Sequence, residues 1–229
     1  MKACVYSLFI GLLVGVTPSG RAAPSGDWRN YKLAVMQTVI EVALPYDRLN
    51  ELTRTDWQVP YRAPRLESLY SGTSTQRRLF TALLDINGPF WIGGVYGRID
   101  FFGIVNKKPE WFKGDLFDLT ALKEMMEHRV RVRGKGNEFR FEIVTINNVP
   151  WVHWFDYDPA ALATGVWAKR LDRYTRPVTD ELYLDVAIDL LKSTTSENLD
   201  WLKKAEPIRE QLKNSLVIKY PAGTPSAAK

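Results

Sequence analysis

The feature that most constrains the fold is a series of strand-like segments joined by short turn signals. Four segments rich in aromatic and β-branched side chains follow one another, at 138–145, 149–157, 165–174 and 182–191. Asn147 and Asn148 separate the first two, and asparagine tolerates the positive φ that a tight hairpin requires. Short connections favour antiparallel neighbours, so the sequence predicts an antiparallel meander.

More strand-like sequence precedes this block, at 31–45, 78–86 and 91–105. The last of these segments contains Gly97 and Gly103, and glycines inside a strand indicate bulges, strong twist or close approach of another backbone. The intervening residues 53–72 contain several prolines and predict an irregular segment.

Two segments have helical periodicity. The first is 118–129, with Asp118 placed to cap its N-terminus. The second begins near Thr194 and Glu197, which have capping-box spacing, and Pro207 either kinks this helix or restarts it. A short strand at 215–219 is expected to rejoin the sheet.

These elements predict an α+β fold, with a central antiparallel sheet and helices packed on it. The expected organisation is a signal peptide at 1–22, one globular domain at 23–220 and a disordered tail at 221–229, which is rich in proline and small residues.

The N-terminus has the pattern of a cleavable secretory signal. Lys2 precedes an apolar run of about a dozen residues, and small residues follow up to a cleavage site after Ala22. Because a membrane-spanning helix needs roughly 20 apolar residues, stable membrane insertion is not expected. The mature protein is therefore predicted to be periplasmic or secreted.

Charge and cysteine content exclude several kinds of partner and site. Removal of 1–22 leaves 29 basic residues against 26 acidic ones, a net charge of +3 that is too small to predict nucleic-acid binding. The single cysteine, Cys4, lies within the signal, so the mature chain is expected to contain no disulfide or cysteine metal site.

The densest group of chemically versatile side chains is the segment 150–159. Strand alternation places His153 on the face opposite to Asp156, so a catalytic histidine would need a carboxylate from elsewhere. Glu142 on the preceding strand is one such partner across the hairpin. Two histidines without ligand spacing predict no metal site, and no motif predicts a cofactor.

Eight tryptophans favour a binding role, since flat aromatic side chains anchor interfaces and stack on sugars. The candidate binding residues lie in consecutive predicted strands: Trp151, Trp154, Tyr157 and Trp167.

Three stretches resemble the PsbP-like (Mog-like) group of α/β/α sandwiches: the hairpin 146–151, the strand 182–188 and the closing run 201–218. The resemblance spans residues 31–220 in outline. It implies a fold used mostly as a non-enzymatic binding or assembly module, often outside the cytosol.

The sequence therefore predicts an exported, non-enzymatic protein that binds another envelope or secreted protein, as an assembly factor or a toxin antagonist. Two alternatives remain at this point. One is an envelope hydrolase that uses His153 with Glu142 or Asp156, and the other is a glycan-binding module. The oligomeric state is not predicted.

Overall fold

The structure is a computed structural model that describes residues 27–46, 76–87, 95–133, 138–157, 169–192 and 200–224. Within these ranges the strands are β1 (Asp27–Val35), β2 (Thr38–Tyr46), β3 (Gln76–Asn87), β4 (Val95–Lys107), β5 (Glu138–Ile146), β6 (Val149–Tyr157), β7 (Lys169–Arg170), β8 (Asp172–Pro177), β9 (Leu182–Lys192) and β10 (Val217–Lys219). The helices are α2 (Leu119–Arg133) and α4 (Asp200–Asn214).

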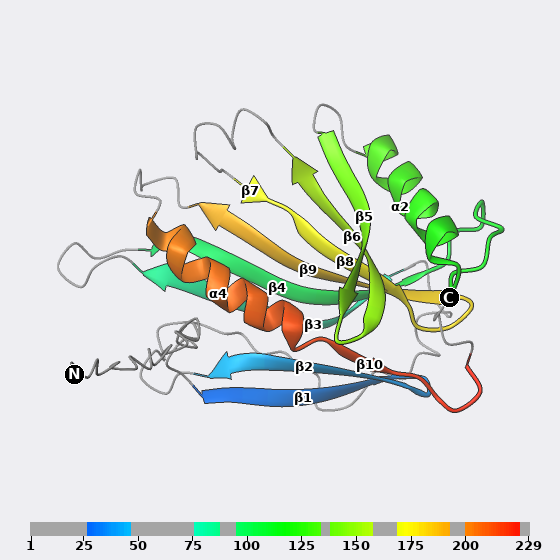
Figure 1. Cartoon of the computed structure of the whole chain (residues 1–229), viewed down its shortest axis with the longest axis horizontal. Coiled ribbons are helices and arrows are strands. Elements are labelled where there is room, and N and C mark those ends of the chain that lie inside the picture. Colours follow the sequence, from blue (N-terminus) through cyan, green and yellow to red (C-terminus); the bar gives the residue numbers. More distant parts are fainter. Residues whose placement is uncertain are drawn as a thin grey trace, which may run out of the picture.

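The large sheet is antiparallel and has the order β3-β4-β9-β8-β6-β5, with β7 paired to β9 (Figure 1). The predicted antiparallel order of the meander is confirmed, because β5, β6, β8 and β9 are successive neighbours, but its third strand lies at Asp172–Pro177 and not at the predicted 165–174. Its last strand, β9, pairs with β4. The chain therefore passes from β4 through α2 to the far edge of the sheet, and the meander returns it to the centre.

The hairpin between β5 and β6 has the predicted asparagine turn. Asn147 and Asn148 have φ values of 51° and 62°, the left-handed conformation that this residue type tolerates. The amide of Asn147 also donates hydrogen bonds to the carbonyls of Asn214 and Leu216, at 2.8 and 2.9 Å. The turn thus holds the end of α4 against the sheet.

A second, smaller sheet has the order β1-β2-β10 (Figure 1). The expectation that the C-terminal strand rejoins the main sheet is wrong, because β10 pairs with β2. Leu33, Val35, Ile40 and Val42 of the small sheet belong to the same buried cluster as the inner face of the large sheet. The N-terminal hairpin and the C-terminal strand therefore form one layer over the large sheet.

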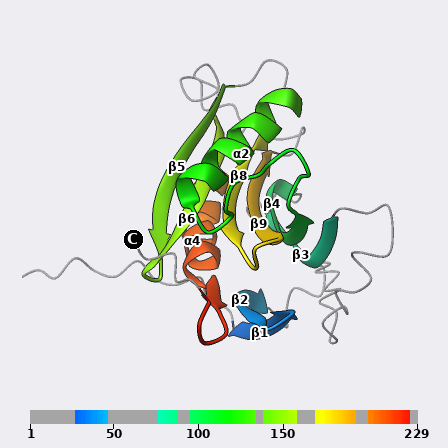
Figure 2. The ribbon, with the colours of Figure 1, turned by 90° about the vertical axis from the view of Figure 1, so that its right-hand side faces the viewer.

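The predicted α+β, α/β/α fold class is wrong. Strands make up well over half of the described residues and the two helices about a fifth, so the protein is mostly β, with two antiparallel sheets. Helix α4 covers only part of its face of the large sheet, and the three-stranded sheet packs where more helix was expected (Figures 1 and 2). The pattern of apolar and β-branched residues in the sequence identified the strands, but it did not show that some of them form a separate sheet.

The core on the α4 side explains two of the strand glycines. Trp201 of α4 is 1% exposed, and a Cβ added to Gly97 would lie 2.2 Å from its ring. A Cβ on Gly103 would lie 2.4 Å from the ring of Phe80. Both glycines are therefore required by the close approach of another group. That group is an aromatic side chain in each case and not another backbone.

Helix α2 lies on the opposite face of the large sheet and begins as predicted. The Asp118 carboxylate accepts hydrogen bonds from the amides of Thr120 and Ala121, at 2.9 and 3.3 Å, which confirms the cap. Helix α4 runs through Pro207 as one helix and does not restart there. Four buried side chains of α2 face the sheet: Leu122, Met125, Met126 and Val130.

Several predictions fall on residues that the structure does not describe. These include the signal at 1–22, the irregular segment 53–72 and the capping box at Thr194 and Glu197. The proposed tail is described only at 221–224, where Thr224 donates to the carbonyl of Pro221 from its amide at 3.2 Å.

Candidate binding site

His153 lies on the α4 face of β6, with both ring nitrogens beside carboxylates. Its Nδ1 is 2.8 Å from Glu142 Oε1 across the β5–β6 pair, and its Nε2 is 2.6 Å from Asp172 Oδ1 on β8. The ring also stacks on Tyr174 at 4.6 Å and on Phe155 at 5.2 Å.

Asp172 is the buried centre of this cluster, with a side chain that is 0% exposed. Arg209 of α4 forms an ion pair with its second oxygen, and Arg170 lies 3.6 Å from the same oxygen. Burial raises the pKa of the Asp172 carboxyl, but the hydrogen bond from His153 and the charge of Arg209 outweigh it and hold the pKa below its usual range. The cluster therefore joins β5, β6, β8 and α4.

The geometry at His153 fits a structural role. A general base needs one ring nitrogen available to a substrate or water, whereas both nitrogens of His153 contact carboxylates. Glu142 does reach the ring, as the hairpin register makes possible, but Asp156 lies on the other face of β6 by strand alternation. The second partner is Asp172, whose pairing with His153 the sequence analysis did not identify.

The candidate binding tryptophans do not share one exposed surface. Trp151 is 1% exposed and packs in the core on the α4 side, whereas Trp154 is 7% exposed and lies on the α2 side. The Tyr157 side chain and Trp167 lie outside the described residues. Of the two candidates whose side chains are described, Trp154 lies in the wall of a pocket.

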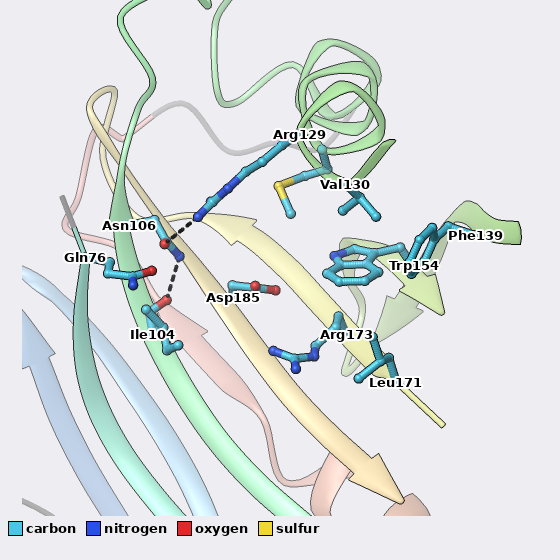
Figure 3. Close-up of a pocket in the computed structure, with 11 residues that line it drawn as sticks. Gln76, Ile104, Asn106, Arg129, Val130, Phe139, Trp154, Leu171, Arg173 and Asp185 are labelled. Carbon is cyan, nitrogen blue, oxygen red and sulfur yellow. Dashed lines mark hydrogen bonds between the residues drawn. The ribbon is translucent and has the colours of Figure 1, made fainter. Parts of the chain in front are cut away.

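This pocket lies between α2 and the large sheet and has a volume of about 370 Å³ (Figure 3). One part of its wall is apolar and comes from α2, β5, β6 and the residue before β8; it includes Val130, Phe139, Trp154 and Leu171. Phe139 packs edge-on against Trp154, with ring centres 5.9 Å apart. A concave site with an apolar wall and a few polar groups is the usual form of a ligand pocket.

Arg173 of β8 is held in the wall by an ion pair and by two aromatic rings. Its Nε and Nη2 donate to the two carboxylate oxygens of Asp189, at 3.0 and 2.7 Å. The guanidinium also lies over the rings of Phe102 and Trp154, 4.8 and 5.8 Å from their centres. These contacts fix the orientation of the guanidinium beside the pocket.

Asp185 of β9 lies between Arg129 and Arg173 in the view of Figure 3. Its Oδ1 accepts a hydrogen bond from the Thr175 hydroxyl at 3.0 Å. Burial raises the pKa of the Asp185 carboxyl above its usual range, although the charges of Arg173 and Arg129 and the bond from Thr175 act in the opposite direction.

The helix side of the polar wall is formed by Arg129 of α2. Its Nη2 donates to Asn106 Oδ1 on β4 at 3.3 Å (Figure 3). Its Nη1 contacts the Tyr183 hydroxyl. The amide of Asn106 in turn donates to the carbonyl of Ile104 at 3.3 Å. Arg129 therefore connects α2 to the two central strands at the pocket edge.

Sequence reasoning did not identify these polar wall residues as a site. One signal was present, because Asp185 and Asp189 interrupt an otherwise apolar strand and alternation places both on one face. Charged residues on one face of a central strand need partners on the neighbouring strand. The identity of those partners depends on register, which the sequence did not provide for β8 and β9.

Neither described helix is long and apolar enough to cross a membrane. Among the described residues, no group of three or more His, Cys, Asp or Glu side chains has an arrangement that would hold a metal ion. In the cluster of Glu142, His153 and Asp172, the imidazole bridges the two carboxylates.

The raised pKa of Asp185 predicts how stability depends on pH. A carboxyl whose folded-state pKa is raised favours folding at low pH and loses that contribution as pH rises through the folded-state pKa. Asp185→Asn should therefore raise the thermal midpoint at pH 7. The gain should shrink as pH falls toward about 3.9, the ordinary value for aspartate.

Thermal unfolding of both proteins from pH 3.5 to 8 measures this difference. A lower midpoint for Asp185→Asn at pH 7 would contradict the prediction, since it would mean that attraction to the two arginines outweighs burial.

Comparisons with protein-family models, curated proteins and solved structures found no match. The PsbP-like resemblance therefore has neither support nor refutation from known proteins.

Proposed function

We propose that this chain is an exported, non-catalytic binding protein that engages another envelope or secreted protein through the pocket beneath α2. The observation that carries the proposal is the pocket itself, about 370 Å³ in volume, with an apolar wall beside oriented polar groups. Aromatic side chains in such pockets commonly form the energetic centre of protein interfaces. The N-terminal signal pattern supports a location outside the cytoplasm.

The surroundings of His153 support a binding role over catalysis. Both of its ring nitrogens contact carboxylates, and its ring stacks on those of Tyr174 and Phe155. The pocket lies on the opposite face of the sheet. A hydrolase built on this histidine would have to break the Glu142 or Asp172 contact before it could act on a proton.

The proposal is tested by filling the pocket without disturbing the rest of the surface. Val130 is 9% exposed and lines the pocket, so Val130→Phe should occupy part of the space that the partner needs. Ile143 is 48% exposed on β5 and does not line this pocket, which makes Ile143→Phe a matched control.

The partner would first be captured by crosslinking in the producing cells, then purified and mixed with each variant. We expect Val130→Phe to weaken the reconstituted complex at least tenfold, about 1.4 kcal/mol, and Ile143→Phe to leave it unchanged. The thermal midpoints of both variants should stay close to that of the parent protein. A complex that tolerates Val130→Phe as well as Ile143→Phe would refute the pocket as the binding site.

A further inference from the structure

We infer that the pocket receives one apolar side chain of the partner together with that residue's own N–H and C=O groups. This inference rests on the proposed function and names the chemistry of its site. It follows from an acceptor and a donor that face the pocket from neighbouring strands, beside the apolar wall.

The acceptor is the second carboxylate oxygen of Asp185. Thr175 donates to Oδ1, whereas Oδ2 has no hydrogen-bond partner among the described residues. The side chain is partly buried and lines the pocket. Because Oδ2 is not one of the buried unpartnered atoms among the described residues, it is accessible from the pocket and can accept a hydrogen bond from a donor that a ligand supplies.

The donor is the remaining nitrogen of Arg173. Asp189 holds Nε and Nη2, and Nη1 makes no hydrogen bond within the described part of the chain. The guanidinium is already oriented by Asp189 and by the rings of Phe102 and Trp154. A ligand oxygen that accepts from Nη1 therefore meets a preorganised donor, which lowers the entropic cost of binding.

The apolar wall contains a further unsatisfied group. Trp154 is 7% exposed, and its indole N–H is buried without a hydrogen-bond partner among the described residues. Buried polar atoms in folded proteins nearly always have partners. The indole N–H groups of Trp28, Trp151 and Trp201 are unpartnered in the same way, so that of Trp154 serves as a reporter of ligands in the pocket and not as evidence for one.

The positions of the acceptor and donor fit a peptide. Arg173 pairs with Ala187, and Thr175 pairs with Asp185, so Arg173 and Asp185 are diagonal neighbours on one face of the sheet. In an extended chain, the N–H and C=O of one residue point to the same side. The N–H would donate to Asp185 while the C=O accepts from Arg173.

The volume limits how much of the partner enters. At about 370 Å³ the pocket lies near the lower end of the range for small-ligand sites. It fits a single apolar residue with its adjoining peptide groups better than a longer segment. The charges around the pocket also favour an uncharged group of the partner. Asp189 already neutralises Arg173, and the carboxylate of Asp185 lies near the positive charge of Arg129.

The test compares two probes on the full mature chain. One is N-acetyl-L-leucine N-methylamide, and the other is the same molecule with the acetamide N–H replaced by an ester oxygen. Binding is followed by the NMR shift of the Trp154 indole N–H, assigned with Trp154→Phe. We expect the amide to bind at least fivefold more tightly than the ester.

Asp185→Asn is the diagnostic variant. The Thr175 hydroxyl still needs an acceptor, which turns the new amide nitrogen toward the pocket and removes the acceptor for the ligand N–H. The preference for the amide should then disappear. Asp180→Asn, an exposed position that does not line this pocket, should keep the full preference.

The possible failures are distinguishable. Equal binding of amide and ester by the parent protein would overturn the inference while leaving the pocket a binding site. Absence of binding by either probe at millimolar concentration, with partner binding still blocked by Val130→Phe, would also overturn the inference alone. A partner complex insensitive to Val130→Phe would overturn the proposed function.

Discussion

Replacement of Asp172 by asparagine should lower the free energy of unfolding by about 3–5 kcal/mol at neutral pH, the usual cost of removing one partner from a buried ion pair. The side chain is fully buried and lies between His153 and Arg209. Loss of its charge leaves the buried His153 ring and the largely buried guanidinium of Arg209 without the carboxylate that they share. Urea unfolding of the parent and the variant measures the difference.

The pH dependence of this effect has a definite sign. His153 and Arg209 outweigh burial and hold the pKa of Asp172 below its usual range. A carboxyl with a lowered folded-state pKa stabilises the protein above its unfolded-state pKa, about 3.9, and the stabilisation is lost as pH falls through the folded-state pKa. The difference between parent and Asp172→Asn should therefore be full at pH 6–7 and shrink below about pH 4.

Glu142→Gln is the matched control, because Glu142 contacts the other nitrogen of the same ring. Its side chain is 54% exposed, so water screens the interaction and the expected cost is about 0–1 kcal/mol. If Glu142→Gln proved as costly as Asp172→Asn, burial would not be the reason for the strength of the Asp172 contacts.

Trp201→Ala should cost about 3–5 kcal/mol, since it removes a fully buried aromatic side chain that anchors α4 on the large sheet. Gly97→Ala should cost about 1–3 kcal/mol in the parent protein, because its Cβ would lie 2.2 Å from the Trp201 ring and force that ring to move. Thermal or urea unfolding measures both.

The double variant tests whether these two effects have one cause. In the Trp201→Ala background the ring is gone, so Gly97→Ala should cost close to nothing. Gly103→Ala is the control, because its Cβ would meet Phe80 and its cost should be the same with or without Trp201. Additive costs for Gly97→Ala and Trp201→Ala would contradict the proposed contact.

Local features of the fold were predictable because they depend on neighbouring residues alone. The asparagine hairpin between β5 and β6 and the Asp118 cap of α2 follow from backbone preferences of single residue types. The pairing of Glu142 with His153 follows from that hairpin, since a two-residue turn sets the register of both strands. These predictions required no knowledge of long-range contacts.

The layering of the fold was not predictable in the same way. A strand has the same alternation whether it belongs to the large sheet or to a separate one. The pairing of β10 with β2 joins residues about 180 positions apart, and nothing in either segment identifies the other. This pairing and the small sheet are the reasons why the predicted α/β/α arrangement was wrong.

The amino-acid sequence by itself determined the strands of the meander, their turn, the capped helix and the face on which each strand residue lies, because backbone preference and alternation act over a few residues. Only the tertiary structure brought Asp172 to His153 and placed Arg173 diagonal to Asp185 beneath α2. Both arrangements depend on strand register, which for β6 with β8 and for β8 with β9 is decided by how the whole chain packs.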